Sequence, residues 1–395
     1  MEKILDSLYS VGVQDPGLRT FDIIMNTPNG STYNAYLLKG SEKTVLIETA
    51  KAGFSDEYFA NIQQITSLDK IDYLIVNHTE PDHAGTIPLL LERNPNITVI
   101  GTTSGIAFVT NIIKDEFKSR VVKKGDTLDL GDRKLEFYPM PNLHWPDTMF
   151  TFDPVNKTLF TCDFFGAHYA YPDLLLSRME DKSTYRESFH QYFMDIMFPF
   201  RSPFVTNGIK AAKELAPKMI CTGHGPILDT DLEYVYEKYT QWAQLPEHAK
   251  GKTVVIVYVS AYEYTKSMAM RIAKTLEDKG LHAHIIDPTK EELNDVISAV
   301  SLADGILFGS PTFLGDMLKP IGEVLTALYP FMVSGKPVSA FGSYGWSGEA
   351  VENITQRAKQ LKMKTMDGIR IRLRPSEEEL DGVEEFASQF AMMLK

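Results

Sequence analysis

The chain has 395 residues, more than a single hydrophobic core usually accommodates, so we expect two domains. Its 40 Lys and Arg residues against 52 Asp and Glu residues give a formal net charge of -12, which repels the phosphates of nucleic acids and anionic lipid surfaces. This charge argues against nucleic acid or a membrane surface as a partner.

The N-terminal residues lack the apolar core of a signal peptide, and no segment approaches the roughly 18 apolar residues of a membrane span. We therefore expect a soluble, cytoplasmic protein. Cys162 and Cys221 are the only cysteines, too few for a disulfide framework, and no C-x-x-C pair is present to hold a rubredoxin-type iron or a structural zinc. Any metal must therefore be held by histidine and carboxylate side chains.

The first 50 residues predict a β meander, because the short runs YSVGV, FDIIMN, STYNAYLLKG and KTVLIETA are separated by Gly, Pro and Asn. From there to about residue 245, apolar strands alternate with amphipathic helices, which is typical of sheets covered by helices. The expected strands are IDYLIVNH, NITVIG, KLEFYPMP, TMFTF, TLFTCDF and KMICTGH, and the expected helices lie near 54–65, 84–93, 104–114 and 207–215.

A polar stretch, LPEHAKGK at 245–252, predicts a linker between a first domain of residues 1–248 and a second of residues 249–395. After it, five strands are each followed by a helical segment. This rhythm predicts one doubly wound parallel sheet. Its expected strands are TVVIVYV, HAHIIDP, GILFGS, PVSAFG and GIRIRL.

The segment HTEPDH brings four potential metal ligands, His78, Glu80, Asp82 and His83, into six residues between an expected strand and a helix expected near Ala84. A multivalent cation offsets the cost of bringing carboxylates and imidazoles together away from water. The alternative is a charged turn that caps the helix, with Asp82 as the N-cap residue.

Three further candidates follow apolar runs in the same half: His144 in PNLHWPD, Asp163 in FTCDF and His224 in CTGHGP. Strand ends meet at one edge of a layered fold, so we expect these side chains near HTEPDH. A single histidine of this kind is more often a hydrogen-bonded core residue, but three such coincidences beside HTEPDH favour a metal site.

Three loops of the second half are rich in Gly, hydroxyl and aromatic residues: SAYEYTKSMA, with a helix expected to open at Lys266, GSPTFLGD and GSYGWSGEA. They follow the first, third and fourth strands, whose ends converge where the strand order reverses and where a flat ring and its phosphate can bind. The alternatives are an ordinary capped helix in the first loop and core packing for Tyr344 and Trp346. The candidate cofactor-binding residues are Ser260, Tyr262, Thr265, Pro311, Thr312, Phe313, Gly315, Ser343, Tyr344, Gly345 and Trp346.

The pattern H-x-E-x-D-H, followed at wide spacing by His, Asp and His, resembles the metal site of the flavodiiron proteins, a branch of the metallo-β-lactamase superfamily. The resemblance covers essentially the whole chain and implies an α/β fold, an N-terminal metallo-β-lactamase-like αββα sandwich followed by a flavodoxin-like doubly wound parallel sheet. Hydrolases of the superfamily carry His where Glu80 stands, and this anionic oxygen ligand favours iron over zinc. The first loop departs from the usual flavodoxin phosphate loop at Glu263 and Tyr264.

Carried over residue by residue, the resemblance implies FMN and two iron ions in a non-haem diiron site. The residue matching His83 does not bind metal directly in every member of the family. Tyr192, His168 and Trp346 become the candidate catalytic residues, and Trp145 a wall of the site, with core packing as the alternative. The implied ligands are His78, Glu80 and His144 for one iron and Asp82, His83 and His224 for the other, with Asp163 as the bridge.

Flavodiiron proteins reduce dioxygen to water, nitric oxide to nitrous oxide, or both, and the resemblance makes this the expected function. The alternatives are a hydrolase with a regulatory flavodoxin domain and a non-enzymatic redox carrier or oxygen sensor. Electrons are expected from an external donor: rubredoxin, a flavoprotein reductase or reduced F420. The family also implies a head-to-tail homodimer, alone or in a dimer of dimers, in which each FMN faces the other chain's irons and Trp346 lines the junction.

Overall fold

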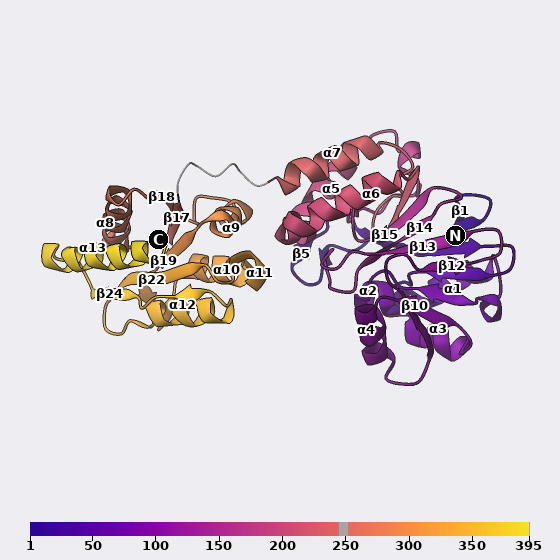
Figure 1. The fold of residues 1–395 in the computed structure, drawn as a ribbon, viewed down its shortest axis with the longest axis horizontal. Helices are drawn as coiled ribbons and strands as arrows, with labels where there is room; N and C mark the ends of the chain where they lie inside the picture. The colour runs from indigo at the N-terminus through magenta and orange to yellow at the C-terminus, as the bar shows by residue number, and fades with distance from the viewer. Residues whose placement is uncertain (245–251, 395) are drawn as a thin grey trace. The chain divides into compact units, whose positions relative to one another are not determined.

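The computed structural model describes residues 1–244 and 252–394, which belong to two compact units (Figure 1). The first unit ends at Gln244. The domain boundary expected between residues 248 and 249 lies outside the described residues and stays a prediction. Within the described ranges, we find no helix with the length and apolar character needed to cross a membrane.

The first unit contains two large sheets. In the first sheet, the strands from β1 to β8 pair antiparallel and those from β8 to β11 pair parallel. In spatial order this sheet holds β1 (Glu2–Lys3), β2 (Leu8–Ser10), β7 (Tyr36–Lys39), β8 (Thr44–Ile47), β9 (Tyr73–Ile75), β10 (Thr98–Gly101) and β11 (Lys118–Val121). The second sheet holds β12 (Thr127–Asp129), β13 (Lys134–Pro139), β14 (Met149–Asp153), β15 (Thr158–Cys162) and β16 (Met219–Thr222).

Alternating apolar side chains pack the two sheets face to face. In β8, Val45 and Ile47 join the cluster that also holds Phe137 and Phe160 of the second sheet, whereas Leu46 points to the opposite face. That face is covered by helices, so the strand is apolar on both sides. Figure 1 shows four layers, helix, sheet, sheet and helix, which confirms the αββα sandwich. The covering helices are α1 (Ser55–Gln63), α2 (Pro81–Ala84), α3 (Ile87–Arg93) and α4 (Thr103–Ile113) on one side and α5 (Ser183–Tyr192), α6 (Thr206–Leu215) and α7 (Leu232–Ala243) on the other.

The second unit is built on one parallel sheet, in the order β18 (His282–Ile286), β17 (Thr253–Tyr258), β19 (Gly305–Gly309), β22 (Pro337–Tyr344), with β23 (Lys364–Thr365) and β24 (Ile369–Arg372) both paired to β22. This is the flavodoxin order, with its reversal between β17 and β19. A short hairpin of β20 (Thr312–Phe313) and β21 (Asp316–Met317) follows β19. The helices are α8 (Tyr264–Asp278), α9 (Leu293–Leu302), α10 (Lys319–Ala327), α11 (Pro330–Val333), α12 (Glu349–Gln360) and α13 (Glu377–Met392).

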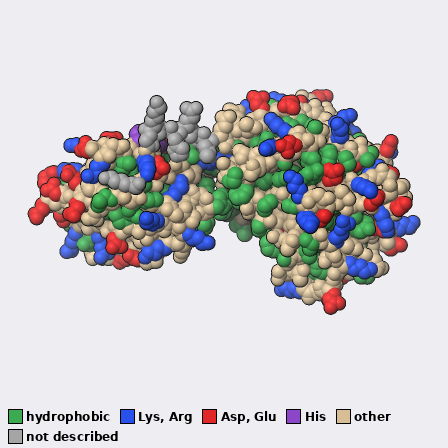
Figure 2. All heavy atoms as spheres, in the orientation of Figure 1, with side chains coloured by type: hydrophobic (Ala, Val, Ile, Leu, Met, Phe, Trp, Pro, Cys, Tyr) green, Lys and Arg blue, Asp and Glu red, His purple; other side chains and the backbone are tan. Residues whose placement is uncertain are grey.

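Acidic and basic side chains are interspersed over the face of each unit that Figure 2 presents. Acidic side chains gather where α13 begins, with Glu377, Glu378 and Glu379 in its first turn. Carboxylates at this end of a helix interact favourably with its dipole, and Ser376 caps the same turn through its side chain. The acidic cluster is therefore explained by helix stability.

Some elements differ from the sequence-based expectation. The segment FDIIMN forms most of a hairpin of β4 (Thr20–Phe21) and β5 (Met25–Asn26) instead of one strand. This hairpin lies in the connection between two other paired strands, β3 (Val13–Asp15) and β6 (Ser31–Tyr33). The helix expected near Ala84 begins earlier, at Pro81, since proline suits the first turn of a helix. The helix expected at Lys266 opens at Tyr264. Strand β11 was not expected because all four of its residues are exposed and give no apolar pattern.

Candidate functional site

The HTEPDH segment follows β9 and enters α2. Glu80 is the N-cap residue of α2 but makes no side-chain capping bond, so its carboxylate is directed elsewhere. Asp82 lies inside the helix, so the alternative in which Asp82 is the N-cap is wrong. Within the described part of the chain, neither carboxylate oxygen of this buried Asp82 has a hydrogen-bond partner. Such buried, unsatisfied oxygens are what a metal ion would satisfy.

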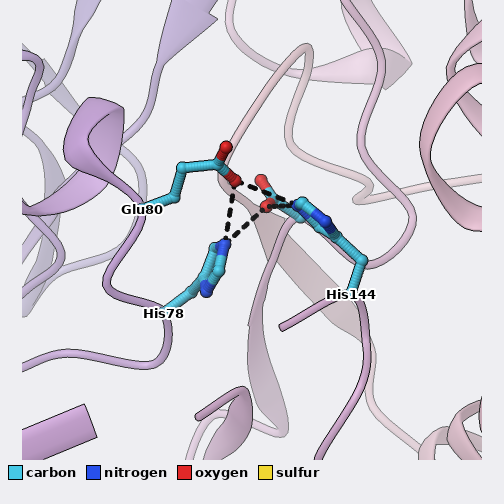
Figure 3. A group of neighbouring side chains, drawn as sticks. His78, Glu80 and His144 are labelled. Atoms are coloured by element: carbon cyan, nitrogen blue, oxygen red, sulfur yellow. Dashed lines mark hydrogen bonds and ion pairs between the residues drawn. The ribbon is translucent and has the colours of Figure 1, made fainter. Parts of the chain in front are cut away.

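His78 and Glu80 of HTEPDH point toward His144, which comes from a separate segment (Figure 3). The Oε2 atom of Glu80 lies 3.1 Å from His78 Nε2 and 3.0 Å from His144 Nε2. Asp163 closes this group, with its Oδ2 atom 3.3 Å from His78 Nε2 and 3.2 Å from His144 Nε2. The four ligand atoms lie within 4.8 Å of one another, close enough to surround one ion.

Asp82, His83 and His224 form a second group on the other side of Asp163. The Oδ2 atom of Asp82 lies 3.3 Å from His83 Nε2 and 3.1 Å from His224 Nε2. The Oδ1 atom of Asp163 lies 2.9 Å from His83 Nε2 and 3.4 Å from His224 Nε2. The two oxygens of one carboxylate are thus divided between two sets of ligands, as a bridging group requires.

The electrostatics of the cluster also fit a metal. Burial alone would raise the pKa of Asp163, but the neighbouring His83, His144 and His78 hold that pKa well below its ordinary value. Burial lowers the pKa of His83, while Asp82 and Asp163 outweigh it and raise this pKa to about 9. Without a cation, protons on the imidazoles must balance the buried carboxylates. Metal ions supply this charge instead, and three carboxylates with four neutral imidazoles form a donor set that suits iron.

His168, Tyr192 and Trp145 lie against the histidine rings of these groups. The His168 ring centroid is 4.9 Å from those of His224 and Tyr192, and the Trp145 ring is 5.2 Å from His78. Among the described residues, His168 Nε2 and Tyr192 Oη are buried without a hydrogen-bond partner. The structure brings these candidates to the cluster, and their roles in catalysis stay predictions.

The three loops expected to bind a cofactor converge in the second unit. The hydroxyl oxygens of Thr265 and Ser343 lie 3.0 Å apart, which joins the start of α8 to the end of β22. The backbone N–H of Ala350 donates to Thr312 Oγ1 at 3.3 Å, which joins the start of α12 to β20. Within the first loop, the N–H of Lys266 donates to Ser260 Oγ at 3.2 Å.

Aromatic side chains of these loops face outward. Trp346 is 88% exposed and Tyr262 is 71% exposed, so core packing is wrong as an explanation for Trp346. Tyr344 is half-buried, with the Arg370 guanidinium 5.9 Å from its ring. Of the remaining candidates, Pro311 is buried and Phe313 is exposed. Gly315 has a φ of 76°, and an added Cβ atom at Gly345 would meet no atom within 4 Å. Outward aromatic rings beside glycines leave room for a flat ring.

Sequence reasoning missed residues that hold the histidines from behind. His224 Nδ1 lies 2.5 Å from the carbonyl oxygen of Thr32, and Ser31 Oγ lies 2.9 Å from His168 Nδ1. Asp147 and Glu48 are buried carboxylates behind HTEPDH. Only Asp147 carried a local signal, since it follows His144 by three residues in HWPD.

Comparisons with known proteins agree with this architecture. A family model described as ODP family beta lactamase matches residues 32–225, and the flavodoxin model matches residues 256–386. The chain is 39% identical to flavo-diiron protein FprA2 of Clostridium acetobutylicum, with 98% of each chain covered. It is 38% identical to type A flavoprotein fprA of Rhodobacter capsulatus, covering 98% of this chain and 90% of that one. The solved structure of rubredoxin oxygen:oxidoreductase from Desulfovibrio gigas matches with a TM-score of 0.68 at 28% identity, covering 99% of this chain and 98% of that chain.

These matches run through both units and reach relatives of nearly the same length. They set aside the hydrolase and the non-enzymatic carrier as alternatives. The chain therefore belongs to the flavodiiron protein family, as an oxidoreductase with a non-haem diiron centre, an FMN-binding flavodoxin domain and an external electron donor.

Proposed function

We propose that this protein reduces dioxygen to water, nitric oxide to nitrous oxide, or both. The observation that carries the proposal is the division of the Asp163 oxygens between two ligand groups, because it holds two ions close enough to act on one small molecule. The matching rubredoxin oxygen:oxidoreductase, which is named for dioxygen, supports the substrate class. When bound, the iron pair supplies open coordination positions and one-electron chemistry, and FMN supplies stored electrons.

Each residue of the cluster has a proposed role. His78, Glu80 and His144 would hold one iron, while Asp82, His83 and His224 would hold the other. Asp163 would offer one carboxylate oxygen to each group. His168 and Tyr192 offer polar atoms at the buried edge of the cluster, where they can orient a small substrate and donate protons to it. In the second unit, the loops after β17, β19 and β22 hold FMN, with the start of α8 as a site for its phosphate.

The cofactor content tests this proposal. We expect about two irons and one FMN per chain after expression in iron-replete medium, since the chain offers two ligand groups and one set of flavin loops. Metal analysis together with flavin absorbance measures both. Stoichiometric zinc with no iron would contradict the assignment of Glu80 and its neighbours to an iron site.

We also infer a head-to-tail homodimer, in which each flavin faces the iron pair of the other chain. Exposed apolar residues near both sites support it. Phe21 packs on His168 while the next residues of its hairpin, Ile23 and Ile24, are 92% and 84% exposed. Beside the flavin loops, Leu314 is 99% exposed. Contact between copies would bury such apolar surface, and a two-fold dimer would form two equal junctions.

Mixing two variants with complementary defects tests this dimer. Asp163→Ala removes the proposed bridging ligand, and Gly342→Ala, assayed without free FMN, leaves its weakened flavin site empty. Random reassembly makes about half the dimers mixed, each with one intact junction, so about a quarter of wild-type activity should return if electrons pass between chains. Native mass spectrometry verifies that mixed dimers form. Mixed dimers without recovered activity would mean that electrons pass within one chain.

The electron donor and the cellular compartment complete the proposal. Both cysteines are buried and free, which suits a reducing compartment, and we place the protein in the cytoplasm. Rubredoxin, a flavoprotein reductase and reduced F420 are the proposed donors. The rate of flavin reduction by each one, measured under anaerobic conditions, ranks them.

A further inference from the structure

The histidines of the metal cluster use Nε2 toward the ligand groups, so the Nδ1 atom of each ring faces away from the metal. What lies behind these Nδ1 atoms decides how each ring is held. For His224 the partner is the backbone carbonyl of Thr32. Behind His78, the first histidine of HTEPDH, the chain instead provides a buried carboxylate, Asp147.

Asp147 lies behind His78. Its Oδ1 atom is 3.4 Å from His78 Nδ1, and its Oδ2 atom accepts hydrogen bonds of 2.7 Å from both the backbone N–H and the hydroxyl of Thr79. Thr102 donates from its hydroxyl to the backbone carbonyl of Asp147 at 2.9 Å. The carboxylate is 1% exposed and fixed from one side, with its second oxygen directed at the imidazole.

Two buried polar atoms in this region, His78 Nδ1 and Asp147 Oδ1, have no hydrogen-bond partner among the described residues. They are a donor and an acceptor that lie 3.4 Å apart, so each offers what the other lacks.

We propose that Asp147 is a positioning residue that accepts the Nδ1–H group of His78. Its carboxylate fixes the ring so that Nε2 is the metal ligand. Its negative charge makes the imidazole a stronger donor and favours the more highly charged ferric state over the ferrous state. Asp147 thereby lowers the reduction potential of the iron centre. The inference rests on the ligand assignment proposed above.

The test compares reduction potentials in variants that keep the shape of the site. Asp147→Asn removes the charge, and we expect a more positive iron potential with about 10- to 100-fold weaker iron binding. Thr79→Val removes only the hydroxyl that shares the charge of Asp147, so the potential should shift the opposite way, to a more negative value. Redox titration followed by electron paramagnetic resonance measures both.

A matched control removes a buried carboxylate that bonds to an arginine instead of to a ligand histidine. Asp153 is 1% exposed and bonds to Arg133 at 3.1 Å, so Asp153→Asn should lower stability and leave the iron potential unchanged. A merely structural role for Asp147 predicts the same behaviour for Asp147→Asn. The opposite signs of the Asp147 and Thr79 variants therefore separate positioning from stability.

An unchanged potential in Asp147→Asn with two irons bound would overturn the proposal. If that variant folds but loses iron, the Thr79→Val protein decides: a negative shift supports the proposal, and no shift overturns it. Failure of the underlying ligand assignment has a different signature, because wild-type protein and Asp153→Asn would then also lack two irons.

Discussion

Replacement of Asp163 by alanine should abolish gas reduction and leave FMN bound and reducible. The Asp163 carboxylate lies 2.9–3.4 Å from the Nε2 atoms of all four histidines of the cluster, so its removal deprives both ligand groups of an oxygen at once. Replacing residues that only support metal ligands already lowers metal affinity or activity by about 10- to 100-fold. We therefore expect turnover to fall by more than about 100-fold when a ligand itself is removed. Iron content, flavin absorbance and gas consumption are the measurements.

The control for Asp163→Ala is Asp153→Asn, which removes a buried carboxylate on β14 that bonds to Arg133 instead of the histidines. It should retain two irons and near wild-type turnover. If Asp163→Ala lost FMN while circular dichroism showed an intact fold, Asp163 would act on the flavin site and the assignment of this residue would be wrong.

Gly342→Ala should produce the converse defect, a protein that holds two irons but binds FMN weakly. Gly342 lies near the end of β22, and an added Cβ atom would lie 1.9 Å from the carbonyl oxygen of Ser310, so the end of β22 and the segment after β19 must move apart. Overpacking of this kind costs about 1–3 kcal/mol, which corresponds to about 10- to 100-fold weaker FMN binding if the strain falls on the flavin site. Fluorescence titration of the apoprotein with FMN measures the change.

Gly322→Ala is the matched glycine control, because an added Cβ in this position of α10 would meet no atom within 4 Å. It should bind FMN as the wild type does. Wild-type FMN affinity in Gly342→Ala would show that the two loops need not approach this closely to form the flavin site.

The metal cluster was accessible from sequence because its ligands lie at the ends of apolar strands. His144, Asp163 and His224 follow or flank such strands, and the two-sheet fold gathers those ends at one edge. HTEPDH adds four side chains through local spacing alone. Pattern and topology together therefore predicted which residues meet, and the fold class of both units was confirmed.

The surroundings of the cluster were less predictable because they depend on tertiary contacts. Ser31 and Thr32 are more than a hundred residues from His168 and His224, which they contact, and nothing in their local sequence marks them. Glu48 ends a strand and resembles any acidic residue before a turn. The FDIIMN hairpin failed as a strand prediction because its turn uses positive φ angles at Asp22 and Ile23, and a β-branched isoleucine rarely adopts such an angle.

Side-by-side measurement of gas consumption by the wild type and by Asp163→Ala is the most direct test of the proposed reduction of dioxygen and nitric oxide. Both proteins, loaded with iron and FMN, receive electrons from one artificial donor, and each gas is supplied separately in anaerobic cells. The wild type should consume at least one gas over many turnovers, while Asp163→Ala should remain more than about 100-fold slower with a reduced flavin. Equal rates in the two proteins would contradict gas reduction at this iron pair. The same conclusion would follow if wild-type protein that holds two irons and reduced FMN consumed neither gas.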